Sequence, residues 1–396
     1  MKKQIERNGI QNKAAAPKER MANLELLRCV AMMMVAALHF LGKGGLLPDL
    51  TGSNLGSAGL AAWLLESFCI VAVDVYMFIS GYFLTTSSFK LSRLLQLWLQ
   101  IWSYSVVFGL LGAFTGVLRE AAFDTHYLLT LLFPVTMEHY WFMTAYVFLY
   151  LLLPLAGIAV KKMTKRQLQL TIVLLLVFFC IGKSVLPVIF EKDAQGYDCL
   201  WYLCVFLTAA CVRRFGAPFL EKKGRGLLLY AGSCLMIFAG TLLLRLVYLR
   251  TGRLEARLGM CMEYNHILPY LAAIGLFGAF ARLRIQGKFA AIVNRVAPYT
   301  LGVYLLHENL GLRYSWQKWL GAERLAAVAA GGGNGFGAVG SLLLGTAAAV
   351  AVVFVCGILA DMVRKWIFDR GHGIMLKVGP YRKLMEKIEK ADAMFR

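Results

Sequence analysis

The sequence predicts an all-α protein that crosses a membrane about ten times, with both termini in the cytoplasm. Three observations support this fold class: an apolar composition, long apolar runs, and basic residues concentrated in alternate loops. Of the 396 residues, 59% are hydrophobic and 16% are charged, and the mean hydropathy is +0.63. A soluble protein has roughly 45–50% apolar and about 25% charged residues. The composition therefore excludes a string of soluble domains, a disordered scaffold and a secreted disulfide module.

The apolar runs have the length of membrane-spanning helices. Such a helix needs about 20 mostly apolar residues, with a range of roughly 17–25. A further apolar piece at 127–137 is expected to lie at the interface or re-enter the membrane, and to break at Pro134. The sixth, eighth and ninth candidates are short, so their boundaries are weakly defined. The ten candidates run over 24–41, 59–84, 92–113, 138–160, 168–189, 199–212, 226–249, 266–281, 298–314 and 336–360.

The distribution of Lys and Arg predicts the orientation of these helices. If the N-terminus is cytoplasmic, the inside segments together with Arg93 hold 30 of the 42 Lys and Arg residues. Cytoplasmic loops attract Lys and Arg, so an even number of spans with both ends inside is expected. The net charge of +20 then sets orientation and contacts anionic lipid, and a nucleic-acid partner is not needed to explain it.

The chain divides into three predicted regions. Residues 1–22 form a basic segment that is expected to be disordered, and residues 23–362 form the membrane domain. The tail, 363–396, carries apolar residues at near-helical spacing among Lys and Arg, which is typical of an amphipathic helix on the inner membrane surface.

The nine cysteines lie mostly in apolar runs without a CxxC pair. A disulfide framework or metal site is therefore not expected.

The first predicted helix carries two ionisable residues on one face. Arg28 and His39 are eleven positions apart, three turns plus about 20°, and are separated by roughly 16 Å along the axis; Glu25 falls on the same stripe. Ionisable groups in hydrocarbon are costly and are candidates for function. Alternatively, Arg28 snorkels to the headgroups and His39 bonds a neighbouring helix. Snorkelling is the expected role of Lys183 and Arg245, close to helix ends.

The second and third predicted helices add an acid and a basic pair. Asp74 lies near mid-membrane, and its structural role would be to pair with a basic residue such as Arg28. Lys90 and Arg93, three residues apart, face the same way at the start of the third helix. A helix N-terminus with two cations is a good site for phosphates, although ordinary cytoplasmic loop charge explains the pair equally.

Two later segments bring further titratable groups into the membrane. Glu138 lies just before Trp141 at the outer end of the fourth helix, either as a solvated interfacial acid or as a catalytic one. The ninth segment places Tyr304, His307 and Glu308 close together, with His307 roughly 14 Å deep. A histidine at that depth is a functional candidate, or it bonds another helix.

In order along the chain, these pieces resemble the membrane acyltransferase 3 family, which O-acylates saccharides and related acceptors at bacterial surfaces. The family has a ten-helix membrane domain. The first matching stretch is the most specific, because it places an arginine and, after ten residues, a histidine in the first helix. The matches extend over residues 23–307 and are NLELLRCVAMMMVAALHF, VAVDVYMFISGYFL, KLSR, EHYWFMTAYVFLYLLLPL and YTLGVYLLH.

The resemblance implies roles for individual residues. Arg28 and His39 would belong to the active site, and the basic pair would contact acyl-CoA from the cytoplasm. The family's usual pair is two arginines; here the first is Lys90, a point charge without the bidentate fork. Glu138 and His307 would complete the catalytic group, with Arg28 also near the donor. Residues in the same stretches are expected to support the site: Asp74, Ser80, Trp141 and Tyr304.

The predicted function is that of an integral plasma-membrane acyltransferase. It would move an acyl group from cytoplasmic acetyl-CoA or another acyl-CoA to a hydroxyl of a surface or lipid-linked saccharide. The resemblance implies an acetyl group, with succinyl as an alternative. His39 would act as general base or carry the acyl group. No metal is expected. The alternatives are a secondary transporter or flippase and a non-enzymatic scaffold. Transporters often show paired broken helices, which the sequence does not clearly show.

Overall fold

The computed structural model describes residues 20–52, 54–115, 124–186, 194–330 and 335–395, which form helices without any strand. Residues 1–19 of the expected disordered segment lie outside these ranges. The helices are α1 (Ala22–Lys43), α2 (Ser57–Cys69), α3 (Ala72–Leu84), α4 (Leu91–Phe114), α5 (Thr125–Leu132), α6 (Trp141–Lys162), α7 (Lys165–Leu176), the π-helical η1 (Val177–Ile181), α8 (Gly182–Val185), α9 (Cys199–Phe215), α10 (Pro218–Glu221), α11 (Arg225–Thr251), η2 (Glu255–Arg257), η3 (Met260–Met262), α12 (Ile267–Ala281), α13 (Gly287–Val296), η4 (Ala297–Tyr299), α14 (Thr300–His307), α15 (Trp316–Trp319), α16 (Ala322–Ala330), α17 (Phe336–Met375) and α18 (Gly379–Ala393).

The fold is that of an all-α, multi-pass membrane protein. Within the described residues, eight helical spans are long and apolar enough to cross a membrane, counting α2–α3, α7–α8 and α13–α14 as one each. α9 and α12 have only 17 and 15 residues, so the expected count of ten stays a prediction, as does the placement of both termini. Large apolar side chains on the outer helices are exposed, including Leu155, Phe178, Leu228 and Leu344. Such exposure suits contact with lipid rather than water.

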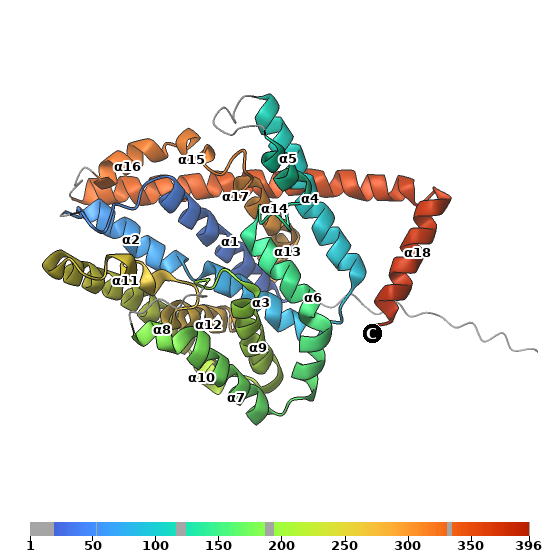
Figure 1. The fold of residues 1–396 in the computed structure, drawn as a ribbon, viewed down its shortest axis with the longest axis horizontal. Coiled ribbons are helices and arrows are strands. Elements are labelled where there is room, and N and C mark those ends of the chain that lie inside the picture. Colours follow the sequence, from blue (N-terminus) through green and yellow to red (C-terminus); the bar gives the residue numbers. More distant parts are fainter. Residues whose placement is uncertain (1–19, 53, 116–123, 187–193, 331–334, 396) are drawn as a thin grey trace, which may run out of the picture.

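The centre of the bundle is formed by α1 and α3 (Figure 1). In the most apolar stretch of α1, 72% of residues are buried, against 22% for α11 at the periphery. α1 packs against α3, α12, α14 and α17. A helix buried on nearly all sides places any polar side chain among other helices, so the polar residues of α1 face protein.

Two glycines bring α14 against α17. A Cβ at Gly357 of α17 would lie 2.4 Å from the Cα of Val303, and one at Gly302 of α14 would lie 2.3 Å from the Cβ of Asp361. No side chain fits at either distance. The two glycines therefore allow the close crossing that fixes the position of His307 at the end of α14.

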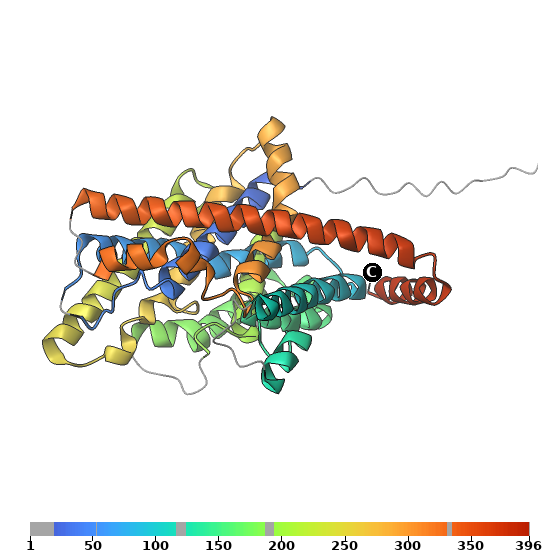
Figure 2. The same cartoon turned by 90° about the horizontal axis from the view of Figure 1, so that it is seen from above.

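The C-terminal part differs from the sequence prediction. α17 continues to Met375, fifteen residues past the expected end at 360. Ion pairs at helical spacing, Arg364–Asp361 and Lys365–Asp369, support this extension. After a break, α18 turns back beside the start of α4 (Figures 1 and 2). There Asp392 accepts a hydrogen bond from the backbone N–H of Ser92, at 3.1 Å.

Two other predicted helices differ from expectation, one by an interruption and one by an early end. The second is interrupted at Ile70 and Val71, between α2 and α3, where two adjacent β-branched residues disfavour a helix. The ninth, expected over 298–314, ends at His307. α13 occupies the expected cytoplasmic loop at 282–297. The consequence for the site is that Glu308 begins a turn rather than continuing a helix.

Candidate active site

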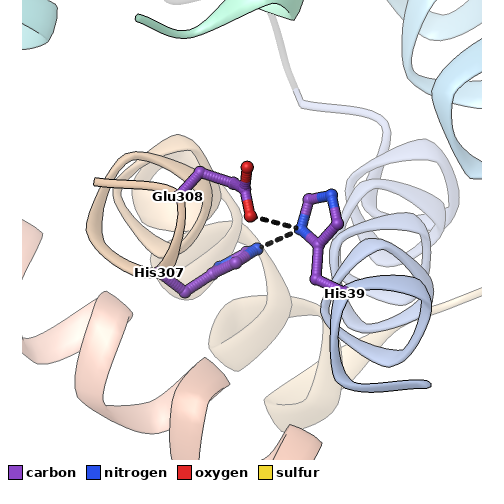
Figure 3. A group of neighbouring side chains, drawn as sticks. All are labelled: His39, His307 and Glu308. Carbon is purple, nitrogen blue, oxygen red and sulfur yellow. Dashed lines mark hydrogen bonds and ion pairs between the residues drawn. The ribbon is translucent and has the colours of Figure 1, made fainter. Parts of the chain in front are cut away.

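Three polar side chains from α1 and the end of α14 meet inside the bundle. His39 Nδ1 lies 2.9 Å from His307 Nε2 and 3.2 Å from Glu308 Oε1 (Figure 3). His307 and Glu308 are buried, and 18% of the His39 side chain is exposed. The site therefore joins the first helix of the chain to a turn nearly 270 residues later.

The hydrogen bonds define which ring nitrogens carry protons. His307 Nδ1 lies 2.6 Å from the carbonyl oxygen of Val303, which can only accept, so Nδ1 carries hydrogen. His307 Nε2 is then an acceptor in the neutral ring, and His39 Nδ1 must be the donor. This assignment leaves the lone pair of neutral His39 on Nε2, which points away from His307 and Glu308 (Figure 3). His39 is thus arranged as a base with an oriented lone pair.

The carboxylate of Glu308 has a cationic partner. Lys43, one turn after His39 on α1, donates hydrogen bonds to both carboxylate oxygens. A buried carboxylate needs such pairing, because its desolvation is costly. Glu308 can therefore hold a proton on His39 Nδ1, while the two hydrogen bonds from Lys43 hold the carboxylate in place.

The same three groups resemble a metal-ligand set in spacing. One ligand atom each from His39, His307 and Glu308 lies within 4.8 Å of the others. The ammonium of Lys43, however, already bonds both oxygens of Glu308. A metal ion would have to displace this charge or bind beside it, so the donor set fits acid–base chemistry better.

A second layer of hydrogen bonds holds the turn that carries Glu308. Arg313 donates from Nη2 to the carbonyl oxygens of Glu308 at 2.9 Å and of His139 at 2.6 Å. Asn309 Nδ2 donates to the Tyr104 carbonyl and to the Tyr140 hydroxyl, each at 3.1 Å. These bonds connect the turn to α4 and to the start of α6, and so fix the Glu308 backbone.

His139 is a neutral member of this second layer. Its Nε2 accepts from the backbone N–H of Leu310 at 3.0 Å, so its Nδ1 carries the hydrogen and faces the Ser105 hydroxyl at 2.9 Å. Burial lowers the pKa of His139 to about 3, and the positive charge of Arg313 acts in the same direction. His139 therefore stays uncharged at physiological pH, and its role is structural: it hydrogen-bonds the backbone of Leu310 and the hydroxyl of Ser105.

A mostly apolar cavity adjoins His39. Its lining includes Tyr76 of α3, Trp141 and Phe142 of α6, and Tyr304 of α14. The lining does not contain Arg28, Lys90 or Arg93. In this conformation the cavity therefore reaches the imidazole but is not continuous with the basic pair.

The basic residues lie at the opposite end of α1. Arg28 lies 3.4 Å from Glu25 and has 26% of its side chain exposed. Arg93 is exposed, and Lys90 is the residue preceding α4. Arg28 and His39 thus share α1 as expected, without contacting one another among the described interactions.

Two expected partnerships are wrong. Asp74 is fully buried and accepts from Trp201 Nε1 at 2.9 Å, rather than pairing with Arg28, which pairs with Glu25 instead. Lys183 does not snorkel; it is 2% exposed and forms an ion pair with Glu263. In both cases rotation of the helix about its axis decides the partner, and sequence spacing does not give that rotation.

The other predicted site residues are spread around the cavity. Trp141 and Tyr304 line it, whereas Ser80 is half-buried elsewhere on α3. Glu138 is exposed, with a φ of 52° in the left-handed region. No described contact brings Glu138 to His39. The acid beside the imidazole is Glu308.

Sequence reasoning did not assign three of the residues that complete the site. The sequence places Glu308 next to His307 without giving it a role, and it gives no role to Lys43 or Arg313. The available signal was an acid directly after the histidine, and a lysine four positions after His39, one helical turn along the same face. Such spacing becomes informative only when α1 and α14 are known to touch.

Comparison with known proteins bears on the same part of the chain. A family model described as an acyltransferase domain matches residues 21–361. No curated protein and no solved structure matches the chain. The match begins at the start of α1, includes every residue of the site described above and ends on α17. The chain belongs to the acyltransferase 3 family and is a multi-pass membrane acyltransferase.

Proposed function

We propose that this enzyme transfers an acyl group, acetyl in the first instance, from cytoplasmic acyl-CoA to a hydroxyl of a surface or lipid-linked saccharide. The plasma membrane is the proposed location. The observation that carries the proposal is the oriented lone pair on His39 Nε2, with Glu308 and Lys43 behind it. A base beside an ionised acid is the arrangement that activates a hydroxyl for acyl transfer.

In the proposed reaction, His39 Nε2 takes the proton of the acceptor hydroxyl while that oxygen attacks the thioester carbonyl. The carbon–sulfur bond then breaks, an ester forms, and the protonated His39 returns its proton to the departing thiolate. Glu308 stabilises the charged imidazole in between. Atoms and charge balance without any metal ion or redox partner.

A covalent route through His39 uses the same nitrogen. In that route Nε2 attacks the thioester, and an acyl-imidazole passes the group to the hydroxyl. Rapid quenching with radiolabelled acetyl-CoA and no acceptor distinguishes the routes. Label on the wild-type protein that is lost in His39→Ala indicates the acyl carrier, and absence of label indicates the base.

The donor would enter at the end of the bundle that carries the basic pair. Lys90 and Arg93 flank the N-terminus of α4, whose free N–H groups and dipole favour phosphate. Arg28, on the same helix as His39, would be the next cation that the donor meets. A shift of the side chains between Arg28 and Tyr76 would then be required to join this entry to the cavity.

His39→Ala tests the central claim. The variant should lose release of coenzyme A from acetyl-CoA by about 10²-fold or more, the usual contribution of a general base, at unchanged protein level. The matched control is His126→Ala, because His126 is exposed and no described interaction joins its side chain to the cluster. Full activity of His39→Ala would refute the proposal. In cells, mass spectrometry of envelope glycans should show loss of an acyl increment.

Arg93→Ala tests the donor site. The variant should raise the apparent KM for acetyl-CoA with a smaller effect on kcat, because the guanidinium would contact phosphate far from the reacting atoms. Arg166→Ala, at another exposed helix start on the same predicted side, should leave KM unchanged. An unchanged KM in Arg93→Ala would remove Arg93 from the donor site.

A further inference from the structure

The C-terminal helix α18 lies against the start of α4, where the donor phosphates are proposed to bind (Figures 1 and 2). Two of its residues are buried: Ile388 is 8% exposed and Asp392 is 7% exposed. They are four positions apart, so they lie on the same side of the helix. α18 therefore meets the rest of the protein through a defined face, and that face carries an acid.

The carboxylate of Asp392 binds the first turn of α4. Its Oδ1 accepts a hydrogen bond from the backbone N–H of Ser92 at 3.1 Å, and its Oδ2 accepts one from the Ser92 hydroxyl. Lys90, at the N-cap position, makes no side-chain hydrogen bond to the helix, because an ammonium group cannot accept one. The first N–H groups of a helix favour a negative charge. The tail thus supplies an acceptor that the local sequence does not.

Other helices of this chain carry such an acceptor in their own sequence. Asp124 accepts from Tyr127 N at 2.8 Å at the start of α5, and Asp198 accepts from Trp201 N at 2.9 Å at the start of α9. These caps cannot leave the helices that they begin. The acid at α4, by contrast, comes from 300 positions later in the chain, on a separate helix. It can therefore move away while α4 stays formed.

The attachment of α18 is suited to such a movement. The connection to α17, residues 376–378, is exposed, and a hydrogen bond of 2.8 Å between the exposed His372 and Tyr381 spans it. At the far end, the Phe395 ring lies 5.0 Å from that of Phe89 and is 43% exposed. An element with little buried surface separates from the fold at a lower free-energy cost than a core helix does.

The docked tail and a bound phosphate need the same position. The N–H that Asp392 occupies belongs to the first turn of α4, between Lys90 and Arg93. A phosphate held by this turn and by the two cations would approach the same N–H group. It carries more negative charge than a carboxylate and has three acceptor oxygens. Two anions at one helix start repel each other, so binding of one excludes the other.

We propose that α18 is an autoinhibitory element. In the docked state the Asp392 carboxylate occupies the phosphate position at the start of α4, and the donor binds there only after α18 has moved away. This inference rests on the donor site of the proposed function. Because only the undocked fraction of the protein binds donor, docking raises the apparent KM for acetyl-CoA. It leaves the chemistry at His39 unchanged.

Kinetics of full-chain variants test the competition. Asp392→Asn keeps an oxygen that accepts from Ser92 and removes the charge, so the apparent KM for acetyl-CoA should fall by about three- to tenfold with kcat changed by less than about twofold. Asp392→Ala should lower KM at least as much. The matched control is Glu389→Gln, which removes the same charge from an exposed position of α18 and should leave KM unchanged.

Accessibility of a cysteine on the buried face reports the movement without any acyl transfer. In phosphatidylcholine nanodiscs, a water-soluble maleimide should label Ile388→Cys more slowly than Lys383→Cys, an exposed position of the same helix. Adenosine 3′,5′-bisphosphate, a phosphate-bearing part of coenzyme A, should accelerate labelling at position 388 severalfold and leave position 383 unchanged. Sodium chloride at the same ionic strength should not accelerate it.

The outcomes separate this inference from the proposed function. An unchanged or raised KM in both Asp392 variants, an equal fall of KM in Glu389→Gln, or labelling at position 388 that ignores the bisphosphate would overturn autoinhibition. If acetyl-CoA is still cleaved, the proposed transfer stands. Bisphosphate-dependent release of α18 in a chain that does not cleave acetyl-CoA would support the competition and refute the transfer.

Discussion

At the residue scale, the structure changes which acid is expected to matter. Glu308 contacts His39 and is buried, whereas Glu138 is exposed. Glu308→Gln keeps the shape but removes the charge that stabilises a protonated His39 and that pairs with Lys43. We expect kcat for acetyl-CoA cleavage to fall by about 10²-fold, within the range of a positioned acid–base group.

Glu138→Gln is the matched control for that measurement. It removes the same charge from the same residue type on the exposed turn before α6, and kcat should change by less than about twofold. A large loss in Glu138→Gln with little change in Glu308→Gln would reverse the assignment and restore the role implied by the family resemblance.

The buried His139 predicts how stability depends on pH. Its pKa falls from 6.5 to about 3 on folding, so between these values the unfolded chain binds a proton that the folded chain does not. Its contribution is therefore fully present above pH 6.5 and is lost as the pH falls. Between pH 7 and pH 5 the loss is about 2 kcal/mol.

Thermal unfolding in nanodiscs at both pH values, followed by tryptophan fluorescence, measures this effect. Other groups titrate in the same range, so wild type is compared with His139→Gln, which keeps an acceptor for the Leu310 N–H and cannot be protonated. The pH-dependent drop in Tm should be smaller in the variant. An equal drop would show that His139 is not held neutral.

The sequence predicts which residues are candidates for the site, but it predicts only in part which of them contact one another. Helical periodicity placed Arg28 and His39 on one face, and depth singled out His307. The pairing of His39 with Glu308 depends on α14 ending at His307, which Asn309 secures through Tyr104 and Tyr140. Those contacts span more than 160 residues, so no local pattern contains them.

At the element scale, the crossing of α14 and α17 is the contact that holds His307 in place. Gly357→Ala would put a Cβ 2.4 Å from the Val303 Cα, so α14 must move. We expect a loss of about 1–3 kcal/mol in stability from overpacking. Acetyl-CoA cleavage should also fall, because Val303 accepts the hydrogen bond from His307 Nδ1.

Gly340→Ala is the control on the same helix, since a Cβ there meets nothing within 4 Å. Alanine is favoured over glycine in a helix by up to about 1 kcal/mol, so this variant should be neutral or slightly more stable. Tm and acetyl-CoA cleavage of the two variants test the contact together. Equal behaviour of both would show that the close crossing is not required.

Helix existence was easier to predict than helix ends. Apolar length identified each long span, but it did not reveal the interruption at Ile70 and Val71 or the extension of α17 to Met375. Apolar composition is similar on both sides of these points. The break and the extension depend on β-branched residues and on ion pairs such as Lys365–Asp369, whose effects are small and local.

At the scale of the whole molecule, charge and hydropathy together predict the topology. The helices in the structure have exposed apolar flanks that require lipid, and the basic residues are concentrated in alternate connections. Cytoplasmic enrichment of Lys and Arg then places Lys383 of α18 inside and Arg253, after α11, outside. Both residues are exposed, so cysteine at either position would be accessible from its own side.

Labelling of single cysteine substitutions tests this topology. In intact cells a membrane-impermeant maleimide should label Arg253→Cys, and it should label Lys383→Cys only after permeabilisation. The unsubstituted chain gives the background from its nine cysteines, most of them buried. The reverse pattern would put Lys90 and Arg93 on the outer side, away from cytoplasmic acyl-CoA. The direction of transfer therefore depends on this result.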